Sequence, residues 1–112
     1  MADAAPLPFE ITPETLAAWR EAGQAHAVLD VREPWELAIA SLPDVLAVPM
    51  AEIPARLEEL PRDRPLVVLC HHGGRSARVT AWLRAQGIGG ATNLGGGIDA
   101  WSRLVDASVP TY

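Results

Sequence analysis

The sequence predicts an α/β domain whose mostly parallel sheet is covered by helices on both faces. Short apolar segments, typical of buried strands, alternate along the chain with segments whose apolar residues recur at helical spacing. Because a helical segment separates each strand from the next, the connections are crossovers and neighbouring strands run parallel. The strands are expected at residues 27–31, 45–48, 66–69 and 91–94.

Chain length and charge limit the possible functions. A chain of 112 residues with 49% hydrophobic residues is long enough for one domain with a modest core. The formal net charge is -5 and the sequence contains no lysine. A broad nucleic-acid interface is therefore not expected, and any anionic ligand must be attracted locally.

The N-terminal region has a composition different from the rest of the chain. Residues 1–8 are rich in alanine and proline and lack apolar periodicity, so we expect a flexible tail there and a single domain over residues 9–112. Asp3 stands where a secretory signal would carry basic residues, and no apolar segment approaches the ~18 residues of a membrane helix. We therefore expect a cytoplasmic protein with no membrane partner.

The helices are predicted from caps and apolar spacing. Thr12 can cap a first helix in which Pro13 occupies the first turn, and Gly23 ends it. Pro34 suits the first turn of a second, short helix. The clearest helix covers residues 76–86, where an apolar stripe ends at a glycine. Two further helices are expected over residues 53–60 and 98–105.

Polar side chains directly follow two of the predicted strands. One such segment covers residues 30–33, and the other covers residues 70–75. Ligands of open parallel sheets bind beyond the carboxyl ends of the strands. These two segments are therefore the candidate sites.

The segment after the third strand contains the only cysteine, Cys70. A single cysteine forms no internal disulfide. Its thiol therefore either packs in the core as a small apolar group or acts as a reactive group. The next residues lead into a helix, and Gly73 and Gly74 tolerate the positive φ and the close approach that a ring of inward-facing amides requires. Such amides, together with the charge of Arg75, favour a reactive thiolate and make the loop an anion cradle.

Two histidines follow the cysteine. Cys70, His71 and His72 are consecutive, so their side chains diverge, and they lack the usual spacing of zinc ligands. We expect no metal at this loop. The two histidines should instead line the mouth of the cradle, where partial positive charge attracts anions, or remain exposed to solvent.

Three segments resemble one known family. Cys70-His71-His72-Gly73-Gly74-Arg75-Ser76 resembles the active-site loop of rhodanese-family sulfurtransferases. Residues 29–36 look like the family's aspartate-arginine-glutamate segment, and residues 93–101 look like its glycine-rich turn. The resemblance implies one three-layer domain with a central, mainly parallel five-stranded sheet. It also implies no cofactor.

The same resemblance implies roles for individual residues. Cys70 would accept sulfane sulfur from thiosulfate or another donor as a persulfide, and cyanide or a thiol would then remove it. The donor or the acceptor could also be a protein. The substrate-binding residues implied are His71, His72, Gly73, Gly74 and Arg75, whose amides would hold the terminal sulfur while Arg75 steers the donor.

Asp30 and Arg32 allow two interpretations. They can support the cysteine loop from the neighbouring strand, or form a structural ion pair at the end of that strand. Residues 40–45 depart from the family pattern, in which Gly-His-Ile-Pro-Gly-Ala is frequent, and only Pro43 clearly matches. The turn geometry there is left open.

Two other functions are possible for the same loop. Related phosphatases and arsenate reductases place a histidine before the cysteine and five residues between the cysteine and the arginine. Here Leu69 precedes Cys70, and four residues separate Cys70 from Arg75. The loop is therefore one residue shorter, which favours binding of a sulfur atom over a phosphate group. The other alternative is a non-catalytic binding module that retains the fold.

Overall fold

The computed structural model describes residues 7–112. Most of the tail expected at residues 1–8 therefore lies outside the described residues. The carbonyl oxygens of Leu7 and Pro8 accept hydrogen bonds from Nη2 of Arg84, at 2.9 and 3.0 Å. Thr92 also donates to Pro8, at 2.7 Å. These bonds fix the start of the described chain against the sheet.

The central sheet has five parallel strands in the order β1-β5-β4-β2-β3, which confirms the expected fold class. Their bounds are β1 Glu10–Ile11, β2 Ala27–Asp30, β3 Leu46–Ala47, β4 Leu66–Leu69 and β5 Ala91–Leu94. The residue pattern did not predict β1, because two residues are too few to show alternation. Pairing with β5 defines this strand instead.

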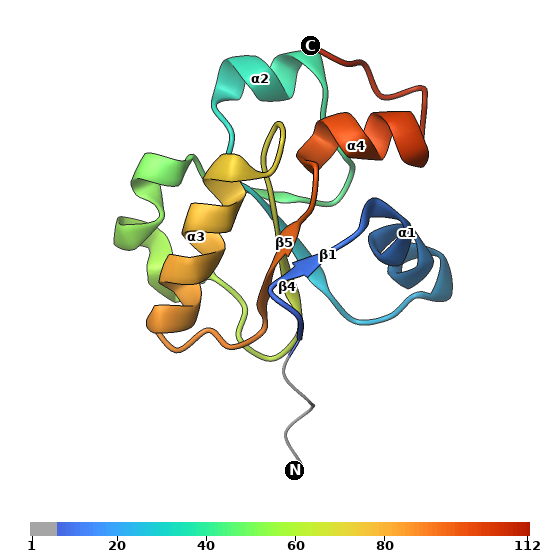
Figure 1. Ribbon diagram of the computed structural model, residues 1–112. Coiled ribbons are helices and arrows are strands. Elements are labelled where there is room, and N and C mark those ends of the chain that lie inside the picture. The colour runs from blue at the N-terminus through green and yellow to red at the C-terminus, as the bar shows by residue number, and fades with distance from the viewer. Residues whose placement is uncertain (1–6) are drawn as a thin grey trace.

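Helices cover both faces of the sheet, as Figure 1 shows. On one face lie α3 and two 3₁₀ segments, and on the other lie α1 and α4. The helices are α1 Pro13–Ala22, α2 Pro34–Ile39, α3 Gly74–Ala85 and α4 Gly97–Leu104, and the 3₁₀ segments are η1 Met50–Glu52 and η2 Pro54–Glu59. Each face has its own buried apolar cluster, so the molecule has three layers.

The predicted α-helix over residues 53–60 is wrong. This region forms η1 and η2, and Arg56, at φ -114° and ψ 18°, interrupts the second of them. Ile53 and Leu60 are nevertheless buried, as their spacing predicted. Hydrogen bonds between residues three apart, such as that from the amide of Leu60 to the carbonyl of Leu57, replace the α-helical pattern, while the apolar side chains still reach the core.

The cap signals of the first helix are confirmed. Thr12 Oγ1 accepts from the amide of Thr15 at 3.1 Å, and Gly23 ends α1 in the left-handed conformation at φ +66°. The third helix begins at Gly74, two positions before the predicted Ser76. This earlier start brings the helix N-terminus closer to Cys70.

The carboxyl ends of β2, β4 and β5 lie at one edge of the sheet. β4 pairs with both of the other strands, so the segments that follow these strands are neighbours. Figure 1 shows the loop between β4 and α3 next to α2 and the start of α4. None of the helices formed by residues 7–112 is long and apolar enough to cross a bilayer.

Candidate active site

Cys70 lies at this edge with its sulfur surrounded by donors. The residue is 1% exposed and directly follows β4. Its Sγ accepts hydrogen bonds from the amide of Gly73 at 3.1 Å and from the amide of Ser76 at 3.3 Å. The hydroxyl of Ser76 lies 3.2 Å from the same sulfur. Ser76 belongs to the first turn of α3, so an otherwise unpaired helix amide stabilises negative charge at Sγ.

The N-terminus of α4 fixes the other side of this loop. The amide of Ile98 donates to the carbonyl of Cys70 at 2.9 Å, and the amide of Asp99 donates to that of His71 at 3.1 Å. Gly97 has a φ of +60°, and a Cβ there would overlap both carbonyl oxygens. Only glycine permits this close approach. The carbonyl groups of Cys70 and His71 are thus bound to α4.

The two glycines of the loop differ in conformation. Gly73 has a φ of +101°, and a Cβ there would lie 3.2 Å from the amide nitrogen of Gly96. Gly74 has no positive φ, and a Cβ there would meet open space. Of the two glycines expected to tolerate a positive φ, only Gly73 adopts one, because Gly74 is already the first residue of a regular helix.

Arg75 is bound to a carboxylate of the protein. Its Nη1 and Nη2 donate to the two oxygens of Glu36 at 2.7 and 2.8 Å. The Glu36 side chain is 3% exposed and that of Arg75 is 36% exposed. Arg75 lowers the pKa of Glu36 to about 2, and Glu36 raises the pKa of Arg75. The charge of Arg75 is therefore largely balanced within the protein.

Asp30 and Arg32 form a fully buried ion pair, with 2.7 Å between Nη2 and Oδ2. Arg32 also donates to the carbonyl of Ala40 at 2.8 Å. In the part of the chain that the structure describes, neither side chain is hydrogen-bonded to Cys70. Both are linked to the cysteine loop through Arg32, whose Nη1 donates to the hydroxyl of Tyr112 at 2.9 Å.

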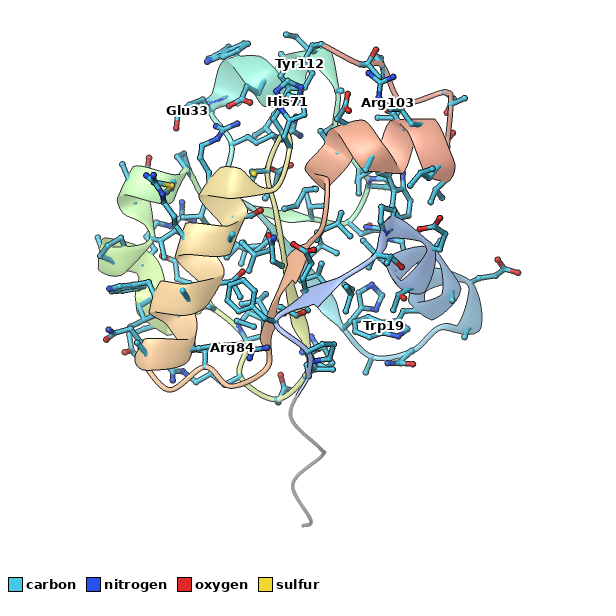
Figure 2. The ribbon with its side chains drawn as sticks, in the orientation of Figure 1. Trp19, Glu33, His71, Arg84, Arg103 and Tyr112 are labelled. Atoms are coloured by element: carbon cyan, nitrogen blue, oxygen red, sulfur yellow. The ribbon has the colours of Figure 1, made fainter. Side chains whose placement is uncertain are left out.

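Tyr112 joins this ion pair to the cysteine loop. Its hydroxyl donates to Oε2 of Glu36 at 2.7 Å, and burial raises the pKa of Tyr112, so the donor proton is retained. Its ring stacks on that of His71, with centroids 3.7 Å apart and an interplanar angle of 4°. Figure 2 shows Tyr112 and His71 side by side above the sheet. The exposed ring of Trp35 packs edge-on against Tyr112.

The histidines lie at the outer side of the loop. His71 is half-buried between Tyr112 and His72, whereas His72 is exposed. Ligand atoms of His71, His72 and Asp99 lie within 4.8 Å of one another. The two imidazoles stack, however, with centroids 3.8 Å apart, so their nitrogens lie side by side and do not converge on one point. This arrangement fits a metal ion poorly.

Asp99 has another partner. Its carboxylate accepts from Nε of Arg103 at 2.9 Å, and this bond, assisted by the charges of His72 and His71, lowers the pKa of Asp99. The carboxylate is therefore an ion-pair member beside the histidines. The site mouth consequently carries both imidazoles and one carboxylate.

Sequence reasoning missed four residues of the site. Ser76, Asn93 and Glu36 each lie within one of the three motif segments. The residue pattern did not indicate, however, that Ser76 contacts Asn93 or that Glu36 binds Arg75. Such pairs join separate strands and helices, so only the fold brings them together. Tyr112 carried no signal at all.

Comparisons with known proteins agree with this geometry. Residues 12–104 match the model of the Rhodanese-like domain family. A sulfurtransferase from Allochromatium vinosum is 42% identical over 94 residues, which cover 84% of this chain and 88% of that protein. The structure of a rhodanese-like domain protein from Staphylococcus aureus superimposes with a TM-score of 0.79 at 30% identity, covering 92% of this chain and 97% of that one.

A longer relative contains a similar domain. The Arabidopsis thaliana protein named adenylyltransferase and sulfurtransferase MOCS3 is 32% identical over 105 residues, which cover 80% of this chain but 23% of that protein. The sequence match, the parallel sheet and the cysteine loop point to one conclusion. This chain belongs to the rhodanese-like family and is, at the level of that family, a sulfurtransferase.

Proposed function

We propose that the protein transfers sulfane sulfur through a persulfide on Cys70. The observation that carries this proposal is the set of donors around its Sγ: two amides and one hydroxyl within 3.3 Å. Donors arranged in this way stabilise an anionic sulfur without a metal or a second cysteine.

The proposed reaction has two steps. The Cys70 thiolate attacks the outer sulfur of a donor such as thiosulfate. A bond forms between Sγ and that sulfur, the S–S bond of thiosulfate breaks, and its electron pair leaves with sulfite. Cyanide or a thiolate then attacks the outer sulfur of the persulfide, giving thiocyanate or a new persulfide, and the Cys70 thiolate leaves.

The loop supplies the proposed substrate contacts. The amide of Gly73 binds Sγ, and we assign the outer sulfur of the persulfide to the other amides of residues 71–75. His71 and His72 add positive charge at the mouth when protonated. Arg75 uses two of its five N–H groups on Glu36, and its remaining donors can contact the donor anion.

The sulfur donor and acceptor are further parts of the proposal. A small sulfur-containing anion and a thiol or cyanide fit the loop, and the longer relative with two named activities favours a protein donor or acceptor as well. A single cysteine gives no sign of a disulfide framework typical of oxidising compartments, so we place the reaction in the cytoplasm.

A phosphatase function is the second enzymatic candidate. It would use the same thiolate, but the four residues between Cys70 and Arg75 make a small ring. A binding module would not need three donors aimed at one buried sulfur. Both alternatives are therefore less well supported than sulfur transfer.

Intact-mass spectrometry after incubation with thiosulfate tests the proposal. The wild-type chain should gain the mass of one sulfur atom and lose it on addition of cyanide, while Cys70→Ser should gain nothing. Absence of the gain with thiosulfate and with other sulfane donors, together with hydrolysis of an aryl phosphate, would establish the phosphatase alternative. If neither reaction occurs, the binding-module interpretation replaces both.

A further inference from the structure

The hydroxyl of Ser76 lies between two hydrogen-bond acceptors. Its Oγ is 3.2 Å from Sγ of Cys70 and 2.5 Å from Oδ1 of Asn93. All three residues are at most 1% exposed, so these groups are shielded from bulk solvent. A serine hydroxyl has one proton, and it can donate to only one of these acceptors at a time.

The orientation of the Asn93 amide is fixed by other contacts. Its Nδ2 donates to Oε1 of Glu10 at 2.9 Å and to the carbonyl of Gly73 at 3.3 Å. A flipped amide would place Oδ1 against these two acceptors, which is unfavourable. Oδ1 therefore faces Ser76 and competes with the cysteine sulfur for the same proton.

We propose that Ser76 is a catalytic residue that donates to Sγ of Cys70 while this sulfur is anionic and to Asn93 once the persulfide has formed. Asn93 is a positioning residue that acts through Ser76. This inference rests on the proposed sulfur transfer at Cys70. It adds that the acceptor of the Ser76 hydroxyl proton changes with the charge on Sγ.

Charge movement during the reaction is the physical basis of this switch. Before attack the negative charge is on Sγ, and a hydrogen bond from Ser76 is strong because its acceptor is ionised. After attack the charge lies on the outer sulfur, and Sγ becomes a neutral bridging atom. The proton then forms its better bond with Asn93. When the sulfur leaves, Sγ is anionic again, so Ser76 also stabilises the leaving group.

The test is the pH profile of alkylation of the sulfur-free protein by iodoacetamide. Ser76→Ala removes the hydroxyl but keeps the amide donor, and the midpoint of its profile should move to higher pH by about one unit. Asn93→Leu removes the competing acceptor, and its midpoint should move to lower pH by about half a unit. The double variant should lie close to Ser76→Ala, because the proposed competition between Asn93 and the sulfur requires the Ser76 hydroxyl.

Thr80→Ala is the matched control. Thr80 is a buried hydroxyl one turn further along α3, and it donates to the carbonyl of Ser76 at 2.7 Å without touching the sulfur. Its profile should coincide with that of the wild type. An unchanged midpoint in Ser76→Ala, or a shift to higher pH in both single variants, would overturn the proposal. If Asn93→Leu does not fold, the midpoint of Ser76→Ala alone decides.

The alkylation experiment contains no sulfur donor, so its result is separate from that of the mass experiment. Failure of wild-type Cys70 to load sulfur would overturn the proposed function. An absent midpoint shift would overturn the role of Ser76 while leaving sulfur transfer intact.

In loaded protein, release of sulfur to cyanide should also be about tenfold slower in Ser76→Ala, because its leaving group has lost one charge-assisted hydrogen bond.

Discussion

The chain segments at the carboxyl ends of β2 and β4 have similar positions in the fold but different chemical properties. Both follow buried parallel strands at the same sheet edge, and both carry charged side chains. At the end of β2, Asp30 and Arg32 bind each other, and Arg32 also binds the backbone carbonyls of Ala40 and Glu36. After β4, amides and a hydroxyl are directed at one sulfur atom. Position at the sheet edge therefore does not by itself make a reactive site, whereas donors arranged around a nucleophile do.

The largest expected effect on stability comes from breaking the ion pair after β2. Arg32→Met leaves the Asp30 carboxylate buried and unpaired, so the free energy of unfolding should fall by about 3–5 kcal/mol. Chemical denaturation measures this loss. Replacing both partners with apolar residues should recover part of it, because no isolated charge then remains.

The Arg32→Met variant also tests whether the ion pair at the end of β2 affects the reactivity of Cys70. The alkylation rate of Cys70, measured where the variant is still folded, should stay close to the wild-type rate. A large change in that rate without unfolding would show that Asp30 and Arg32 take part in the chemistry.

The next largest effect is expected at the first glycine of the cysteine loop. Gly73→Ala forces a side chain into a φ of +101° beside the amide of Gly96, so unfolding should become easier by about 1–3 kcal/mol. Displacement of the Gly73 amide from Sγ should also slow sulfur loading. Thermal denaturation and the loading rate measure the two effects.

Gly74→Ala is the matched control for this substitution. Its helical conformation and open surroundings accept a methyl group, so stability should rise by about 0.4–1 kcal/mol. Equal destabilisation in both variants would contradict the assignment of positive φ to Gly73 alone.

An effect on stability of similar size, but dependent on pH, is expected at Glu36. Because Arg75 lowers its pKa from the ordinary value of 4.5 to about 2, the folded state favours the ionised carboxylate. The stabilisation is fully present above about pH 4.5 and is lost as the pH falls through about 2. Since Arg75 is partly exposed, we expect Glu36→Gln to cost about 2 kcal/mol at neutral pH.

Denaturation curves at several pH values test this expectation. The stability difference between wild type and Glu36→Gln should shrink steadily between pH 4.5 and pH 2. A constant difference over this range would mean that the ion pair does not cause it.

The sequence predicted the fold well because its signals are local. Thr12 and Gly23 mark the ends of α1 through bonds within a few residues, and the apolar run of β4 delivers Cys70 to the sheet edge. Contacts between distant segments carry no such signal. Asn93 meets Ser76, and Tyr112 meets Glu36, only because parallel strands and the returning C-terminal segment bring them together.

The most direct test of Cys70 as the sulfur acceptor is the amount of sulfite released from thiosulfate in the absence of any acceptor. A covalent persulfide predicts a single burst of about one sulfite per chain, and no burst from Cys70→Ser. Sulfite release that continues without an acceptor, or a burst of equal size from Cys70→Ser, would contradict the account.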